Sequence, residues 1–252
     1  MSPARPLRSL LVAPFLLLAS ASAPARAESP VRIDLEAGAV WQERNDFAVP
    51  GTTGTRVALA PYDKGPWAAF RGTLTWDAGE RWSLRFVAAP LSTTTTFTPA
   101  SPVDFQGQVF AAGEPLTVDY KFNSYRATWY YRFPSSGSVS FRGGLTANVR
   151  DARIGLTNPQ LSSAKANVGF VPLLYGGIRW QAAERFALDL EAEGLAAPQG
   201  RAGDVALRGE WALSRRVSLS AGVRLLEGGA DNDEVYNFAT FVYAIGGVSV
   251  RF

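Results

Sequence analysis

Arginine and carboxylate side chains are the residues of this 252-residue sequence whose types and spacing could do chemistry. The chain has 25 Lys and Arg against 22 Asp and Glu, and it contains neither His nor Cys. Without Cys there is no thiol nucleophile, disulfide or Cys-based metal site, and without His the side chain most used for acid and base work near neutral pH is missing. The chemistry that remains is carboxylate catalysis, a Ser–Lys pair, ion pairing or ion selection.

Catalysis has no local signature in this chain. The three lysines, Lys64, Lys121 and Lys165, lie in or close to predicted loops, so a Ser–Lys dyad would have to be assembled there. Carboxylate pairs cannot be told apart from a structural network of charges by sequence alone. The net charge of +3 is small and no basic run is present, which argues against nucleic-acid binding. The sequence therefore predicts a protein that is not an enzyme, has no cofactor and binds no nucleic acid.

The predicted loop 227–234 is the most acidic stretch after the N-terminal segment. Ca²⁺ takes several carboxylate and carbonyl oxygens, so Asp231 to Glu234 is the candidate for a metal. The spacing fails the EF-hand pattern, because Val235 and Tyr236 stand where another ligand and a glycine would continue it. We therefore interpret the loop as solvated and predict no metal site, while Ca²⁺ binding there is left open.

The elements that must position the charges are β-strands, because period-two alternation dominates from Val31 onward. Short turns alternate with long loops rich in Gly, Pro, Thr and Ser, and the two longest loops are 44–66 and 90–119. The patch 103–110 could lengthen a hairpin beyond the bilayer, or it could add a strand pair and so make twelve strands. Eight strands is the other alternative to ten. The ten predicted strands are 31–42, 67–77, 81–89, 120–133, 138–150, 167–181, 185–194, 204–213, 217–226 and 238–252.

Nearly every predicted strand has one apolar face and one charged face. In the third strand, for example, Trp82, Leu84 and Phe86 lie opposite Arg85. A soluble sandwich or lipocalin-like barrel would also alternate, with its charged face outside. Aromatic residues near the strand ends favour a transmembrane barrel instead, because interfacial girdles of a membrane barrel are placed there. The predicted girdle consists of Trp76, Trp82, Trp129, Phe133, Trp180 and Trp211.

If the apolar faces point to lipid, the charged faces meet in the lumen. They form either a narrow Arg-lined pore that selects ions or a core of paired guanidinium and carboxylate groups. A ten-stranded barrel is close to the size at which side chains fill the interior, and inward Tyr130, Tyr175, Phe241 and Tyr243 would fill it further. The predicted lumen residues are Arg71, Arg85, Arg126, Arg132, Arg142, Arg150, Arg179, Arg208, Arg224 and Arg251, with Asp34, Glu36, Asp189, Glu191, Glu193, Asp204 and Glu210.

The N-terminus reads as a signal peptide over residues 1–27. Arg5 and Arg8 form its charged region, residues 10–19 its apolar region, and residues 25–27 read Ala-Arg-Ala, an A-x-A cleavage site. Cleavage after Ala27 leaves residues 28–252 as one β-barrel domain, and residues 19–21 are an alternative, earlier site. The apolar run is too short for a spanning anchor, and no later segment approaches that length, so any membrane crossing must use strands.

In the last predicted strand, Val242, Ala244, Gly246, Val248 and Val250 alternate outward and are followed by the C-terminal Phe252. This strand resembles the terminal strand of bacterial outer-membrane β-barrel proteins. The resemblance implies a closed antiparallel up-and-down barrel in the outer membrane. It also implies that Phe252, Val250 and Val248 are part of the signal read by the barrel assembly machinery, after periplasmic chaperones have carried the chain.

Three functions are compatible with this resemblance. The first is a structural or surface-interaction role, with a largely filled lumen and long extracellular loops that contact an unspecified ligand. The second is a narrow, porin-like channel for ions or small solutes, with an Arg-rich lining as the selective element. The third is a lipid-modifying or proteolytic barrel enzyme, such as a hydrolase or acyltransferase lacking His, which is disfavoured because such enzymes as a rule use a catalytic His. The sequence predicts no partner beyond outer-membrane lipids and the assembly factors.

Overall fold

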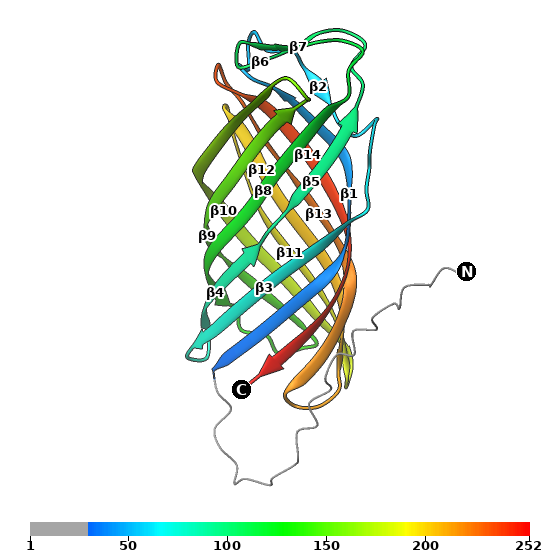
Figure 1. Cartoon of the computed structure of the whole chain (residues 1–252). Helices are drawn as coiled ribbons and strands as arrows, with labels where there is room; N and C mark the ends of the chain where they lie inside the picture. Colours follow the sequence, from blue (N-terminus) through cyan, green and yellow to red (C-terminus); the bar gives the residue numbers. More distant parts are fainter. Residues whose placement is uncertain (1–29) are drawn as a thin grey trace, which may run out of the picture.

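The computed structural model describes residues 30–252 as a tall closed β-barrel with both described chain ends at the end that carries the short turns (Figure 1). The predicted signal peptide, residues 1–27, lies outside the described residues. No helix within residues 30–252 is long and apolar enough to cross a membrane.

The barrel wall has ten antiparallel strands, each paired with its neighbour in the chain. Strand β14 pairs with β1 from Arg251 opposite Arg32 to Tyr236 opposite Ala48, which closes the sheet. The prediction of an all-β barrel with about ten strands is confirmed, and the alternatives of eight and twelve are wrong. The wall strands are β1 (Val31–Ala48), β3 (Trp67–Ala78), β4 (Trp82–Ala89) continued by β5 (Ser92–Phe97), β8 (Leu116–Arg132), β9 (Val139–Thr157), β10 (Ser162–Ala183), β11 (Phe186–Ala197), β12 (Gly200–Ala212), β13 (Val217–Asp231) and β14 (Tyr236–Arg251).

The third wall strand is interrupted once. Strands β4 and β5 both pair with β8, and the break between them falls at Pro90 and Leu91, because proline has no N–H for the ladder. The backbone of Leu91 is held at the break by its own hydrogen bonds: its N–H donates to Asn123 Oδ1 at 2.9 Å, and its carbonyl accepts from the Phe122 N–H at 2.9 Å.

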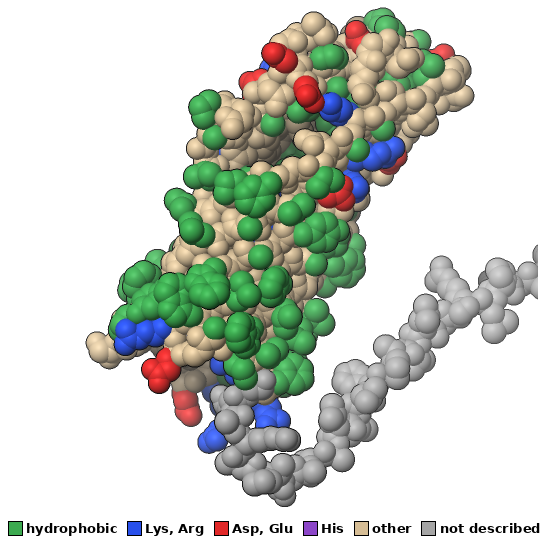
Figure 2. All heavy atoms as spheres, turned by 90° about the vertical axis from the view of Figure 1, so that its left-hand side faces the viewer, with side chains coloured by type: hydrophobic (Ala, Val, Ile, Leu, Met, Phe, Trp, Pro, Cys, Tyr) green, Lys and Arg blue, Asp and Glu red, His purple; other side chains and the backbone are tan. Residues whose placement is uncertain are grey.

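Apolar side chains cover the outside of the barrel as a belt. Along β10, Val168, Phe170, Leu174, Ile178 and Trp180 are all exposed at alternating positions. The twelve residue steps from the first to the last rise about 3.3 Å each along a strand tilted by about 45°, which gives a belt roughly 28 Å tall. That height matches the hydrocarbon core of a bilayer, about 30 Å. In Figure 2, hydrophobic side chains gather over the lower part of the face turned to the viewer, and charged side chains lie at its two ends.

Several strands extend beyond their predicted ends on the long-loop side. Strand β8 begins at Leu116 rather than 120, β9 ends at Thr157 rather than 150, and β10 begins at Ser162 rather than 167. The alternation that defines a lipid-facing strand is lost there, because outward positions such as Ser162 and Ala164 no longer carry large apolar side chains. The extensions therefore follow from strand pairing rather than from an apolar face.

The two longest loops fold back over the barrel mouth. Strand β2 (Val57–Ala58) pairs with β1, while β6 (Val103–Phe105) and β7 (Gln108–Phe110) pair with each other as a hairpin outside the wall. The expected patch 103–110 is thus a hairpin, but the side chains of Val103, Phe105 and Phe110 point inward, whereas Val109 is exposed. These three buried side chains belong to one cluster, here called the plug, whose members include Phe47, Leu59, Leu91, Phe97, Val103, Phe105, Phe110, Leu116, Val118, Leu156 and Phe241.

Phe105 is central to the plug. Its side chain is 1% exposed and its ring packs edge-on against Phe47 at a centroid distance of 6.0 Å. Phe105→Ala should loosen the hairpin, since removal of a buried Phe costs about 3–5 kcal/mol. We expect proteolysis of 98–115 to accelerate at least tenfold while the barrel itself stays folded. Val109→Ala in the same hairpin, 58% exposed, is the control and should leave the rate unchanged; equal rates for both variants would contradict the inward packing.

Candidate functional site

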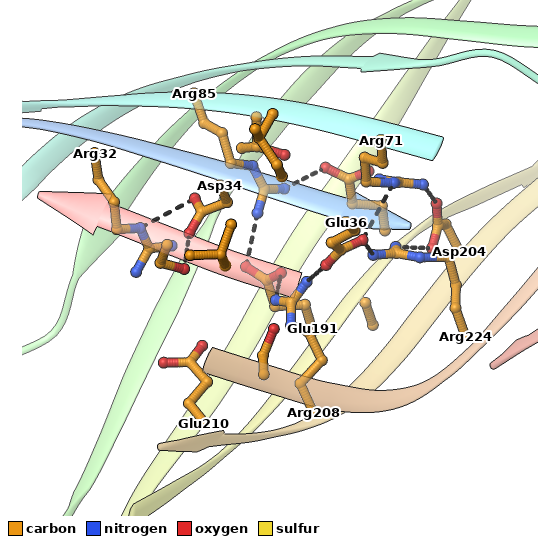
Figure 3. A pocket seen from close by; sticks show the side chains of 17 residues that line it. Arg32, Asp34, Glu36, Arg71, Arg85, Glu191, Asp204, Arg208, Glu210 and Arg224 are labelled. Atoms are coloured by element: carbon orange, nitrogen blue, oxygen red, sulfur yellow. Dashed lines mark hydrogen bonds and ion pairs between the residues drawn. The ribbon is translucent and has the colours of Figure 1, made fainter. Parts of the chain in front are cut away.

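The lumen below the plug holds a network of ion pairs, here called the charged lattice. Each of its arginines contacts at least two carboxylates, and the ion pairs link all members into one set. Figure 3 shows the part of this set around Glu36, Glu191 and Asp204. The lattice comprises seven arginines and six carboxylates: Arg71, Arg85, Arg126, Arg142, Arg179, Arg208, Arg224, Glu36, Asp189, Glu191, Glu193, Asp204 and Glu210.

Glu36 and Asp204 are shared by arginines from several strands. Arg224 bridges the two, with Nη2 at 2.8 Å from Glu36 and Nη1 at 2.7 Å from Asp204. Arg71 pairs with Asp204 at 2.8 Å, and Arg126 reaches the same carboxylate at 2.8 Å. Glu36 also accepts from Arg208 at 2.7 Å. Since Glu36 lies on β1 and Arg208 on β12, their contact crosses the lumen between strands that are not neighbours.

Strand β11 supplies three carboxylates to the lattice at alternate positions. Asp189, Glu191 and Glu193 all point inward because side chains two residues apart share a face of a strand. Arg85 of β4 reaches two of them, Glu191 at 2.7 Å and Glu193 at 2.8 Å. Arg142 of β9 pairs with Asp189 at 2.7 Å. A row of like charges on one strand is thereby neutralised by arginines from other strands of the wall.

Two threonines complete the coordination of Glu193. Thr146 Oγ1 donates to it at 2.9 Å and Thr128 Oγ1 at 3.2 Å, and both side chains are buried. Sequence reasoning did not single out either residue. Their inward position follows from the same alternation that places Arg126, but nothing in the sequence showed which carboxylate they would meet.

The lattice leaves little free space. The cavity among Glu36, Arg71, Arg208 and Arg224 has a volume of about 40 Å³, which accommodates only a few water molecules. Burial makes each unpaired charge costly, so a shared partner is what allows the charges to remain inside. The geometry is that of a packed core rather than a row of free guanidinium groups.

The short-turn end of the lumen is wider. A cavity of about 260 Å³ lies there, lined by residues that include Asp77, Arg132, Arg179 and Glu210. Arg132 hydrogen-bonds to Asp77, and Arg251 lies 3.6 Å from the same carboxylate. The structure therefore places Arg132 and Arg251 at the rim of the lumen, outside the charged lattice.

The remaining predicted inward residues lie beside, above and below the lattice, and Phe241 and Tyr243 belong to the plug. Tyr130 and Tyr175 lie beside the lattice with their rings 5.2 Å apart, and Tyr175 donates to Glu191 at 2.7 Å. Arg150 lies higher, between the lattice and the plug, where its guanidinium stacks over the Phe122 ring at 3.8 Å. Asp34 lies lower, pairs with Arg32 at 3.1 Å and accepts a hydrogen bond from Ser249.

All six residues of the predicted girdle lie beside the short turns, with their side chains about half exposed. Trp82 of β4 and Trp129 of β8 pair across neighbouring strands at a centroid distance of 5.6 Å, and Trp211 of β12 pairs with Phe186 of β11 at 6.1 Å. Phe252 lies at the same end, 51% exposed, and its N–H donates to the Val31 carbonyl at 3.1 Å. Val250 and Val248 pair with Ile33 and Leu35 of β1. The exposed girdle positions are Trp76, Trp82, Trp129, Phe133, Trp180 and Trp211.

The acidic loop does not gather its carboxylates. No group of three or more acidic side chains within residues 30–252 is arranged to hold a metal ion. Glu234 instead accepts a hydrogen bond from Lys165 at 2.9 Å, which lowers the pKa of that carboxyl. Asn232 Oδ1 accepts from the backbone N–H groups of Glu234 and Val235, both at 3.0 Å, and so stabilises the turn.

The three lysines do not form a dyad with serine among the described residues. Lys64 pairs with Glu43 at 2.8 Å, Lys121 with Asp151 at 2.8 Å, and Lys165 with Glu234. Each ammonium group is thus held by a carboxylate near the surface. The expectation that the chain is not an enzyme stays a prediction.

Comparison with known proteins identifies the architecture. No protein-family model and no curated protein sequence matches the chain. Among solved structures, the outer membrane protease OmpT from Escherichia coli matches with a TM-score of 0.53 at 9% identity, over 90% of this chain and 99% of that one. The chain has the fold of a bacterial outer-membrane β-barrel. At this identity, the likeness concerns the barrel alone.

Two further barrels match with lower scores. The attachment invasion locus protein Ail of Yersinia pestis has a TM-score of 0.40 at 11% identity, over 86% of this chain and 98% of that one. The translocator domain of the autotransporter NalP from Neisseria meningitidis has a TM-score of 0.42 at 10% identity, over 90% of each chain.

The charged lattice should carry much of the barrel's stability. Arg126→Met leaves Glu193 and Asp204 each short of a partner, and breaking a buried ion pair costs about 3–5 kcal/mol. Arg201→Met is the control, because Arg201 is 49% exposed and pairs only with Glu227, a contact worth under about 1 kcal/mol. Urea titration of the refolded barrel in micelles, followed by Trp fluorescence, measures the free energy of unfolding of both variants. An equally small loss for the two variants would show that the lattice adds little.

Proposed function

We propose that this chain is an integral outer-membrane barrel with a sealed lumen, whose role is structural or lies in contacts made by its long extracellular loops 49–66 and 98–115, here called the cap. The observation that carries the proposal is the double seal. The charged lattice fills the middle of the lumen, and the plug covers the mouth with apolar side chains from the loops that contain β2 and the β6–β7 hairpin.

The exposed belt supports insertion into a membrane. An apolar surface of this extent around a closed wall would be unfavourable in water, whereas in lipid it is the expected outer face of a β-barrel. The half-exposed tryptophans at the short-turn end match an interfacial girdle. We infer that this end faces the periplasm, since short periplasmic turns and longer extracellular loops are the rule for such barrels.

The narrow channel is the second candidate, and the lattice geometry counts against it. An ion-selective pore needs charged groups that a passing ion can reach. Every lattice arginine already contacts two or more carboxylates, so an entering anion would have to compete with several buried partners at once. A barrel enzyme has no supporting observation in the described lumen.

An ordered cap supports a role at the surface. Tyr62 is exposed and stacks on Phe97 at a centroid distance of 4.3 Å, so the outer loops present side chains on a fixed base rather than on free segments. Such a surface can contact a partner with little loss of loop entropy.

Bilayer conductance tests the seal. We expect the refolded barrel to be silent in a planar bilayer, with insertion verified separately. Replacing residues 100–112 with two glycines, a link that fits because Gly113 N–H bonds to the Pro99 carbonyl at 2.9 Å, should remove part of the plug yet stay silent. Adding Arg126→Ala and Arg224→Ala to that deletion should open a conducting path, since both seals are then weakened.

Steady conductance of the unaltered chain, with an ion preference that Arg126→Glu shifts, would contradict the sealed lumen and establish the narrow channel instead.

Export and assembly form a linked part of the proposal. We infer cleavage of a signal peptide near Ala27, transfer by periplasmic chaperones and recognition of Phe252, Val250 and Val248 by the barrel assembly machinery. The exposed Phe252 ring supports this, because a partner can reach it while β14 is paired with β1.

Phe252→Ala should reduce the amount of assembled barrel in outer-membrane fractions severalfold without changing the stability of barrel already folded. Leu213→Ala is matched to it, because Leu213 is 52% exposed beside another short turn and lies outside the terminal strand. Quantitative blotting of the folded and unfolded bands in outer-membrane fractions measures the amount of assembled barrel for both variants. Equal assembly of the two variants would count against a terminal signal.

A further inference from the structure

The barrel wall has an opening on its long-loop side. The ladder between β10 and β11 stops at Leu174 opposite Gly194, although β10 continues upward to Ser162. Pro172, which has no backbone N–H, lies at this point, and the ladder is not resumed above it. The β11–β12 hairpin turns back at Gln199, so its tip forms the floor of the opening, here called the window.

A cavity of about 370 Å³ leads inward from the window. Its lining is mostly apolar and includes Phe122, Ile154, Phe170, Val171 and Leu195. Figure 2, which faces the side of β9 and β10, shows the wall hollowed toward its upper end. The volume lies within the range of small-molecule sites, about 300–1,000 Å³.

Arg150 lines the inner wall of this cavity. Its side chain is 8% exposed, stacks on Phe122 and donates one hydrogen bond, from Nη1 to the Phe122 carbonyl at 3.2 Å. It forms no ion pair with any carboxylate of residues 30–252, unlike the seven arginines of the lattice below it. A buried guanidinium without an anionic partner bears an uncompensated desolvation cost, which an anion in the cavity would offset.

The strand edge at the window is also incomplete. Backbone groups on the β11 side of β10, from Ser162 to Leu173, have no strand partner in the part of the chain that the structure describes. Outward Val168 and Phe170 on the same segment are exposed and continue the apolar belt. An open edge does not persist against lipid hydrocarbon unless it lines a polar cavity or is covered. The window thus combines free polar groups with an apolar approach from the membrane.

We propose that the window binds an anionic amphiphile, with its phosphate or carboxylate group at Arg150 and its hydrocarbon chain along Phe170, Val171 and Leu195. The charge of the ligand follows from the unpaired arginine, and its chain from the apolar lining that meets the belt. Lys165 and Glu234 form an ion pair at 2.9 Å above the opening, so the ligand enters from the side through the membrane face. This site is independent of whether the lumen conducts.

Two variants separate the charge from the shape of the site. Arg150→Gln removes the anion partner. Gly169→Leu fills the cavity, because Gly169 faces it beside Arg150 and a Cβ there meets only open space. Gly176→Leu is the matched control: it lies on the same strand, also has open space at its Cβ, and points outward to lipid.

Native mass spectrometry of the refolded full barrel in a neutral detergent should detect bound dodecyl phosphate and not dodecanol. We expect retention by the unaltered barrel and Gly176→Leu, and a loss of about tenfold or more in Arg150→Gln and Gly169→Leu, as for removal of a charged hydrogen bond. Equal retention by all four proteins, or equal retention of dodecanol, would overturn the proposal.

A second experiment, on barrel extracted from outer membranes, distinguishes a membrane lipid from a diffusible amphiphile as the source of the ligand. Barrel extracted from outer membranes that carries a phospholipid or lipid A mass, lost in Arg150→Gln, identifies a membrane lipid. Extracted barrel that is empty but takes up added dodecyl phosphate through Arg150 identifies a diffusible amphiphile. If neither the refolded nor the extracted barrel carries an amphiphile through Arg150, the proposed site is refuted. The sealed-lumen proposal is tested separately by bilayer conductance, so either proposal can fail without the other.

Discussion

Closure of the backbone hydrogen-bond ladder is the constraint on which the rest of this structure depends. In hydrocarbon, every N–H and C=O of a spanning segment needs a partner, and a sheet meets that demand only when its last strand pairs with its first. The β1–β14 ladder does so over almost the full length of both strands. Closure then fixes which side chains face lipid and which face the lumen, because alternate residues point to opposite sides.

The interior follows from that division. A ten-stranded wall is too narrow to hold a wide water column, so charged side chains directed inward must pair with one another. Arginine suits this role, since its planar group can contact two carboxylates at once. The plug solves the same problem at the upper end with apolar side chains. One barrel therefore has two kinds of core, arranged one above the other.

The sequence predicted the strands and the direction of the charges well, because lipid and lumen impose opposite requirements on neighbouring residues. It could not predict which charges meet. The contact of Arg85 with Glu191 depends on the stagger of strands on facing walls, which no local pattern records. The inward fold of the outer loops was missed as well. Phe105 and Phe110 were visible as an apolar patch, but whether they face the barrel or the exterior depends on Phe47 and other residues far away in the chain. The lack of a carboxylate partner for Arg150 within residues 30–252 likewise depends on the position of every carboxylate in the folded barrel.

The sharing of carboxylates in the lattice limits how this protein can change over evolutionary time. A lipid-facing Leu can be exchanged for Val or Phe one position at a time. Asp204 serves three arginines, so its loss leaves several charges stranded and is tolerated only if other strands change with it. In related barrels, the lipid-facing residues should accordingly vary one by one, whereas the charged residues of the lumen should be kept or changed together. The pattern of charges in the lumen should therefore persist longer than the sequence of the outer surface.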